Sequence, residues 1–304
     1  MGNRPLRLWR SLGLGFRAMA FTYARPHAEV WVPDGAMLGP ALERTTDLGI
    51  VAHQDDLEFA CLAPIAACLE NPERWFTGVA CTDGAGSARS GAFAECSDEE
   101  MRVLRRQEQR AAAEIGGYSA ILQLGHPSAE VRGDGHATLV DELVEVLGAA
   151  QPVNVYTHNL ADKHSTHLAV AAATIEAVRR LPASERPWRL VGIEGWRSLD
   201  WLSDDEKILL DTSGHRDLAQ RLSGVFASQI EGGKRYDLAE EGRRRANATM
   251  LEPRAVDDLE ELTLAMDLTP LVHNVDLDPV TYVTAAIDRL KADVSEALAS
   301  YFPR

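Results

Sequence analysis

The chain has 304 residues, of which 45% are hydrophobic and 25% charged, a composition typical of a globular protein with a large core. The chain has 31 Lys and Arg residues and 46 Asp and Glu residues, which gives a net charge of −15. So acidic a chain would repel a phosphate backbone or an anionic membrane surface, and we expect neither nucleic acid nor membrane as a partner. Its apolar runs also stay short of the roughly 20 residues that a transmembrane helix needs.

The first 45 residues show no clear element, and we expect them to form an N-terminal arm and extension. Arg17 interrupts residues 12–24, the one stretch that could form the apolar core of a signal peptide, so we expect a cytoplasmic protein. Four cysteines fall in the first third of the chain without CxxC spacing, at Cys61, Cys68, Cys81 and Cys96. This usage predicts reduced thiols.

From Asp47 onward, short apolar or β-branched runs alternate with longer helical patterns, which predicts a parallel sheet with crossover helices. The expected strands are 47–52, 75–82, 120–124, 153–157 and 188–194. The expected helices are 57–70, 97–115, 137–149 and 166–180. The helix at 97–115 has the clearest boundaries, with a capping box at Ser97 and Glu100 and a stop signal at Gly116 and Gly117. We predict an α/β fold with a Rossmann-like, open, mostly parallel sheet and helices on both faces.

Beyond residue 200 the alternation of short apolar runs and helical patterns becomes less regular. Expected helices lie near 215–226, 236–250 and 280–300, and a strand near 261–266. We interpret the region from about 235 as a C-terminal α/β extension of one domain, residues 46–304, and not as a second domain.

Two polar clusters directly follow the first and fourth expected strands, where ligands gather in open α/β sheets. His53 and Asp56 are three residues apart across a strand-to-helix turn, and His164 and His167 are three apart at the start of a helix. Two imidazoles and one carboxylate leave a coordination position open for water. That pattern is typical of catalytic zinc, and it also suits another divalent metal such as Fe²⁺.

These clusters resemble the motifs of the PIG-L or LmbE-like zinc-dependent N-deacetylases. Residues 53–58, HQDDLE, look like the family's HPDDxE, and residues 164–167, HSTH, look like its HPDH. Supporting features are Thr82-Asp83-Gly84, the helix at residues 105–108 and Ser228-Gln229, so that the similarity spans about residues 46–230. The resemblance implies zinc bound by His53, Asp56 and His167, with Asp55 as the general base and His164 polarising the substrate carbonyl.

Two positions depart from the family motifs. Gln54 replaces a proline, and Thr166 replaces an aspartate that lies close to the catalytic groups in the family. We expect the threonine at position 166 to affect the reaction rate and the substrate preference more than metal binding. Asp162 is a candidate for a compensating carboxylate, and its alternative role is a helix N-cap.

The chemistry of amide hydrolysis fits these residues. Zinc can lower the pKa of bound water to about 7 and polarise a carbonyl, a carboxylate such as Asp55 can take the proton, and His164 can stabilise the oxyanion. We therefore expect a metal-dependent hydrolase that removes an N-acetyl group from a soluble small molecule, with an N-acetylglucosaminyl-type conjugate as the leading substrate class. The alternatives are a broader small-molecule amidase and a non-catalytic sugar- or nucleotide-binding protein on the same scaffold.

Candidate substrate contacts are Arg89, in a glycine-containing loop, and Trp196, with Trp201 as a second aromatic candidate and His158 as a residue near the metal. We expect the pocket to be shaped by four loops, at about 84–96, 125–136, 195–214 and 230–237. The sequence leaves the oligomeric state open, and a homo-oligomer is compatible with it.

Overall fold

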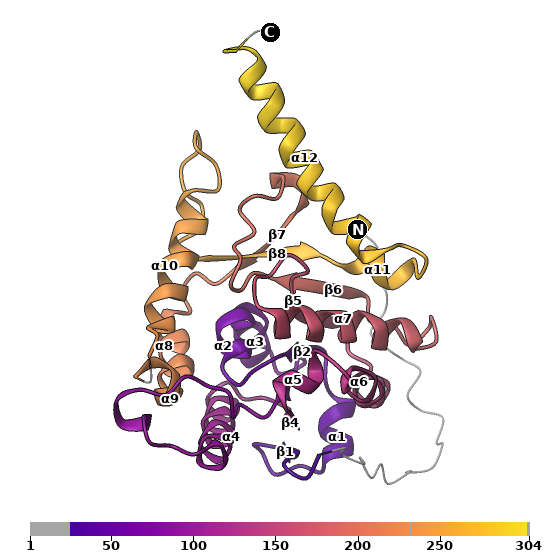
Figure 1. Ribbon diagram of the computed structural model, residues 1–304, viewed down its shortest axis with the longest axis vertical. Coiled ribbons are helices and arrows are strands. Elements are labelled where there is room, and N and C mark those ends of the chain that lie inside the picture. Colours follow the sequence, from indigo (N-terminus) through magenta and orange to yellow (C-terminus); the bar gives the residue numbers. More distant parts are fainter. Residues whose placement is uncertain (1–24, 232, 303–304) are drawn as a thin grey trace.

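The computed structural model describes residues 25–231 and 233–302, which form one eight-stranded sheet between two layers of helices (Figure 1). The strand order is β1-β4-β3-β2-β5-β6-β8-β7. Five strands run parallel in the middle: β2 (Asp47–Val51), β3 (Phe76–Thr82), β4 (Ala120–His126), β5 (Asn154–His158) and β6 (Arg189–Ile193). The antiparallel strands are β1 (Glu29–Trp31), β7 (Lys207–Asp211) and β8 (Leu262–Asp267).

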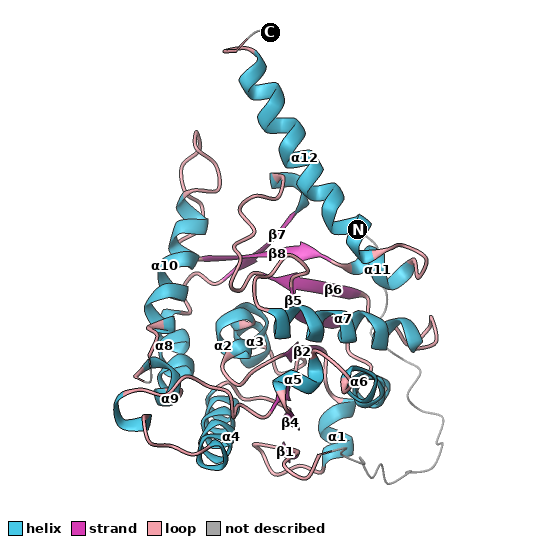
Figure 2. Cartoon of the chain, viewed as in Figure 1, coloured by secondary structure: helices cyan, strands magenta, loops and turns pink. Residues whose placement is uncertain are grey.

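Helices cover both faces of the sheet (Figure 2), and each face has its own hydrophobic cluster. One layer holds α1 (Leu38–Glu43), α5 (Ser128–Val131), α6 (His136–Ala150), α7 (Ser165–Arg180) and α11 (Thr269–His273). The other holds α2 (Asp56–Ala60), α3 (Leu62–Leu69), α4 (Asp98–Ile115) and α8 (Arg216–Gly224). Because both faces are covered, the central strands are apolar almost throughout, and all of β3 is buried. The predicted fold class is confirmed.

The C-terminal third adds α9 (Ala227–Ile230), α10 (Tyr236–Thr249) and α12 (Pro279–Ala299). Helix α12 projects away from the sheet at the top of Figure 1. No helix in the described part of the chain is long and apolar enough to cross a membrane.

All five predicted central strands are present, as are the C-terminal strand and helices, but the expected helix 57–70 is wrong as a single element. It is split into α2 and α3 at Cys61. The cause is Pro64, whose ring would clash with the carbonyl of Ala60 in a continuous helix and which has no N–H to donate. The capping box of α4 is confirmed: Glu100 N donates to Ser97 Oγ, and Ser97 N donates to Glu100 Oε2.

Six of the described α-helices and β-strands had no counterpart in the prediction: β1 and α1, within the expected N-terminal extension, and the later elements α5, β7, α9 and α11. The strands β1 and β7 lie at the edges of the sheet and contain no fully buried residue, whereas continuous apolar runs are expected for strands that are buried on both faces. The expected arm over residues 1–24 lies outside the described residues.

The amino end of β2 holds a buried carboxylate. Asp47 is fully buried and accepts hydrogen bonds from Arg74 Nη2 at 2.8 Å, Asn154 Nδ2 at 3.0 Å and the Tyr156 hydroxyl at 3.1 Å. These donors join β2 to β5 and to the segment before β3, so the carboxylate clamps the sheet at one end.

The chain leaves the other end of β2 and crosses over to β3, which lies on one side of β2 in the sheet. Strand β5 lies on the opposite side of β2, and the chain runs from it to β6. This reversal is a topological switch point, the place where open α/β sheets present a crevice for ligands. The loops after β2 and β5 meet there.

Candidate metal centre

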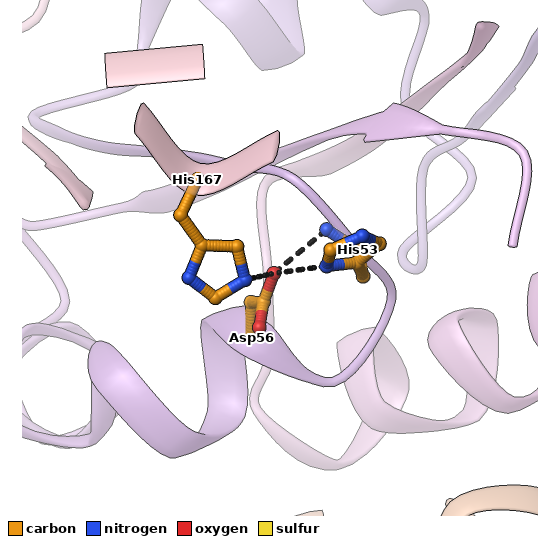
Figure 3. Close-up of side chains that lie close together, drawn as sticks. All are labelled: His53, Asp56 and His167. Carbon is orange, nitrogen blue, oxygen red and sulfur yellow. Dashed lines mark hydrogen bonds and ion pairs between the residues drawn. The ribbon is translucent and has the colours of Figure 1, made fainter. Parts of the chain in front are cut away.

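His53, Asp56 and His167 converge at this switch point, with their ligand-type atoms within 4.8 Å of one another (Figure 3). Asp56 Oδ2 lies 3.1 Å from Nδ1 of His53 and 3.4 Å from Nε2 of His167. The turn after β2 supplies the first two residues, and the first turn of α7 supplies the third. The structure therefore brings together the three residues that the sequence predicts as ligands.

The turn that carries Asp55 is strained. Asp55 has φ +87°, a region that residues other than glycine rarely occupy. Its backbone N–H donates to Gln109 Oε1 at 3.2 Å, and Arg105 donates to the carbonyl of Gln54. His53 N donates to Asp56 Oδ2 at 2.7 Å, which closes the turn. These bonds hold a conformation that presents Asp55 and Asp56 to the same space.

Gln54, which stands where the resembling motif has proline, stabilises this turn through its side chain. Its buried amide nitrogen donates to the carbonyl of Thr82 at 3.0 Å and to Gln123 Oε1 at 3.2 Å, and so connects the turn with β3 and β4. Gly84, at φ +72°, lies so close that an added Cβ would come within 2.8 Å of Gln54 Oε1. Glycine at this position is therefore required by the packing of the turn.

Asp162 orients the histidines on the other side of the site. Its Oδ2 lies 3.2 Å from Nδ1 of His167, and its Oδ1 accepts from the backbone N–H of His164 at 3.0 Å. Because Nδ1 of His167 faces a carboxylate, Nε2 is left to face Asp56, as expected for a ligating histidine. Asp162 thus contacts both histidines of the second motif.

His158 lies beneath the cluster. Its ring stacks on that of His167 with centroids 3.8 Å apart, and its Nε2 lies 3.6 Å from Asp56 Oδ2. His158, Asp162 and His167 also lie close enough to hold a metal. However, Nε2 of His158 already accepts from the backbone N–H of Ala52 at 2.8 Å, so the first group is the better ligand set.

The two adjacent carboxyl groups differ in their electrostatics. Burial raises the pKa of Asp55 to about 6, although neighbouring Arg105 favours the charged form. Burial would also raise the pKa of Asp56, but His167 and His53 together hold it below its ordinary value. A pair of carboxyl groups with pKa values pushed apart is typical of sites where one residue binds charge and the other moves a proton.

Arg105 and Glu108 on α4 support Asp55 from behind. Arg105 is 1% exposed, and its Nη2 lies 3.3 Å from Asp55 Oδ2. Glu108 accepts from the backbone N–H of Ser228 at 2.8 Å and from its hydroxyl at 2.7 Å. The features named above as supporting the resemblance thus form one buried network that joins α4, α9 and the turn.

A cavity of about 710 Å³ opens above the cluster. All four loops expected to shape the pocket contribute to its lining, for example Gly84, Arg132, Trp196 and Lys234. Its wall includes the ring of Trp196, which is 40% exposed and lies 6.2 Å from that of His164.

Two residues named as substrate contacts lie elsewhere. Arg89 donates to the carbonyl of Ala85 at 2.9 Å and pairs with Asp98, and it does not line this cavity. Trp201 packs against the hydrophobic core. Other lining residues were not found from the sequence: Tyr236, Glu240 and Arg243 come from α10, far along the chain and without any recognisable spacing.

The donor set fits a divalent metal. Nε2 of His167 is buried and has no hydrogen-bond partner among the described residues, which is costly unless something else binds it. It faces Asp56 and His53, so that two nitrogens and one carboxylate oxygen converge. This combination suits Zn²⁺ or Fe²⁺.

Residues 48–178 match the PIG-L family, described as GlcNAc-PI de-N-acetylase. The chain is also 28% identical over 155 residues to a protein of Escherichia coli K12 described as the uncharacterized deacetylase YaiS, a match that covers 50% of this chain and 77% of the relative. The matched region contains both motifs and every residue of the metal cluster.

Solved structures share the architecture. The N,N'-diacetylchitobiose deacetylase of Pyrococcus horikoshii superposes with a TM-score of 0.59 at 17% identity, covering 80% of this chain and 91% of that one. GalB, the 4-carboxy-2-hydroxymuconate hydratase of Pseudomonas putida KT2440, gives 0.58 at 19% identity, covering 74% and 96%. At these identities the likeness shows a common fold, and that fold carries more than one reaction.

Proposed function

Because residues 48–178 match the PIG-L family, we propose that the chain is a metal-dependent N-deacetylase of small N-acetylated molecules. The observation that carries the proposal is the convergence of His53, Asp56 and His167 beside a second carboxylate, Asp55, at the floor of a cavity. A ligand set and a separate proton acceptor are the two parts that hydrolysis of an amide needs.

His53, Asp56 and His167 would hold the metal, which we propose to be zinc, with Fe²⁺ as the alternative. When bound, such an ion supplies Lewis acidity, which polarises an amide carbonyl and makes water more acidic. Asp162 fixes the ring of His167 through Nδ1 and thereby keeps its Nε2 directed at the site.

Asp55 would be the general base. Arg105 lies 3.3 Å from Oδ2 and stabilises that oxygen, which leaves Oδ1 to accept the proton of the attacking water. The same oxygen would then return the proton to the departing amine. A group in this role contributes typically 10²–10⁴-fold to the rate.

His164 would stabilise the developing oxyanion by donating a hydrogen bond. Its ring lies 5.0 Å from that of His53 and 4.5 Å from that of His167, measured between centroids, so it borders the cluster without belonging to the ligand set. Asp162 accepts the backbone N–H of His164 at 3.0 Å and positions the residue at the start of α7.

The cavity suits a sugar-sized substrate. Its volume of about 710 Å³ lies within the range of roughly 300–1,000 Å³ usual for small-molecule sites. Trp196 and Tyr236 form an aromatic corner, with ring centroids 6.1 Å apart, on which a pyranose ring could stack. We propose an N-acetylglucosaminyl-type conjugate as the substrate class.

The test is a deacetylation screen of the zinc-loaded protein against N-acetyl sugars, their glycosides and N-acylated amino acids, with metal content measured in parallel. We expect His53→Ala and His167→Ala to lose both metal and activity. Full metal occupancy in both folded variants would rule out this ligand set.

Three further outcomes separate the alternatives. Equal or faster cleavage of an N-hexanoyl sugar than of the N-acetyl sugar would favour a broader amidase. Saturable sugar binding by the metal-loaded protein, without hydrolysis of any amide, would favour a binding protein, whereas water addition to an unsaturated acid would indicate a hydratase.

A further inference from the structure

The charged side chains around the cavity are mostly neutralised by one another. Arg105 pairs with Asp55, Arg243 lies 3.3 Å from Glu240, and Arg235 pairs with Asp237. Glu194, another lining residue, accepts from Asn247 and from the backbone N–H of Leu264. The local charges that remain available to a ligand are therefore few.

Arg132 is an exception. Its Nη1 donates to the hydroxyl of Thr166 at 2.8 Å, and within the described part of the chain it forms no ion pair with a carboxylate. The residue is exposed and lies in the loop after α5, at the cavity wall. Among the described residues, the partner of its positive charge is thus a neutral hydroxyl.

Thr166 places this charge close to the reaction centre. It is fully buried in the first turn of α7, immediately before His167, so the guanidinium that it binds is held beside a metal ligand. At this position the resembling motif has an aspartate, which would neutralise an arginine at hydrogen-bond distance. Here the threonine orients Arg132, and no carboxylate in the described part of the chain compensates its charge.

We propose that Arg132 determines specificity by binding an anionic group, a carboxylate or a phosphate, on the amine portion of the substrate. The inference rests on the proposed deacetylase function and names a property of its substrate. A guanidinium binds both kinds of oxyanion with paired hydrogen bonds, and one arranged beside a metal site fixes the distance from the anion to the scissile amide. Lys234, whose ammonium lies 4.2 Å from the centre of the Trp196 ring, adds a second positive charge to the wall.

The experiment compares kcat/KM for three N-acetylated probes: N-acetylglucosamine, N-acetylglucosamine 6-phosphate and N-acetylmuramic acid, the last two carrying a phosphate and a carboxylate. We expect the parent protein to prefer one of the anionic probes, and which one it prefers identifies the anion. Arg132→Met should lower the ratio of anionic to neutral kcat/KM at least about tenfold, the effect expected when a hydrogen bond to a charged group is lost.

Lys163→Met is the matched control. It also removes one positive charge next to His164, but Lys163 is exposed and does not line the cavity. We expect this variant to keep the ratio of the parent. If Lys163→Met and Arg132→Met lowered the ratio equally, a general electrostatic effect would replace direct binding by Arg132.

Thr166→Asp tests the same idea without removing Arg132. The new carboxylate would lie within reach of the guanidinium, and we expect it to lower the anionic-to-neutral ratio while the neutral probe is still cleaved. An unchanged ratio in both Arg132→Met and Thr166→Asp, with metal bound, would overturn the proposal.

Binding of glucosamine and glucosamine 6-phosphate, measured by calorimetry, separates this inference from the proposed function. Tighter binding of the phosphate that depends on Arg132, without cleavage of any probe, would support the anion site and contradict the deacetylase. Cleavage of the probes with no preference for either anionic one would support the deacetylase and contradict the anion site.

Discussion

Asp162 Oδ2 lies 3.2 Å from Nδ1 of His167, the ring nitrogen that faces away from Asp56. The contact fixes both the orientation and the protonation of the imidazole, because a carboxylate holds a proton on the nitrogen that it faces. The site's metal affinity should therefore depend on a residue that does not touch the metal.

Asp162→Asn should weaken zinc binding about 10- to 100-fold, the usual effect of removing a partner of a ligating histidine. The measurement is a competition titration of the metal-free protein against a chelator of known affinity. Asp200→Asn, at an exposed position, is the control. Parent-like zinc affinity in a folded Asp162→Asn protein would show that this contact does not tune the ligand.

Asp55→Asn should keep the metal and lose activity, because the amide cannot accept the proton while the proposed ligands His53, Asp56 and His167 remain. We expect kcat to fall about 10²- to 10⁴-fold. Zinc content and turnover are measured on the same sample. Loss of zinc, with activity restored by excess metal, would mean that Asp55 is itself a ligand.

Gly195→Ala should disturb the site without changing any polar group. A Cβ at Gly195 would lie 2.6 Å from Asp162 Oδ2, a distance that ordinary contacts do not reach. The carboxylate must then move away from His167, so zinc affinity should fall in the direction expected for Asp162→Asn. Gly148→Ala, which meets nothing within 4 Å, serves as the matched control.

The combined variant gives a sharper test. If Gly195→Ala acts through Asp162, adding it to Asp162→Asn should cost less affinity than it does alone. Fully additive losses would show that the glycine acts by another route.

Glu240→Gln should change the pH dependence of stability. Burial raises the pKa of Glu240 to about 7 from its ordinary 4.5, although Arg243 opposes the shift. The raised pKa means that this carboxyl stabilises the fold fully below about pH 4.5, and that its contribution is lost as pH rises through 7.

Glutamine cannot ionise, so the variant avoids that loss. We expect its urea midpoint, compared with that of the parent, to become more favourable between pH 5 and pH 8. Midpoints measured at pH 5, 6.5 and 8 check this, and a difference that stays constant across them would contradict the burial effect.

The sequence predicted the central fold and the metal cluster for a physical reason. Strands buried on both faces need continuous apolar runs, and residues at the carboxyl ends of β2 and β5 must meet at the switch point, so local patterns carried long-range information. His53, Asp56 and His167 could be found in this way.

The rest of the cavity depends on contacts between distant segments. Arg132 gains its importance from a hydrogen bond to Thr166, 34 positions later, and Tyr236 reaches the site from a helix with no motif of its own. Arg89, in contrast, stands in a loop that looked suited to ligands, but its side chain is occupied by Asp98. The hydrophobic periodicity of a sequence predicts which face of a helix or strand is buried, but it does not predict which side chains from distant segments pair.

Strand β2 begins with a buried carboxylate, Asp47, and is followed by a partly buried one, Asp56. Asp47 is saturated by protein donors, whereas Asp56 faces histidines arranged for a metal. The strand separates them by roughly 17 Å, and among the described residues they share no hydrogen-bond or ion-pair partner, so substitutions at the two ends should act almost independently. Substitutions around Asp47 should therefore change the thermal stability of the protein with little effect on its substrate range. Substitutions in the cavity should change the substrate range with little effect on thermal stability.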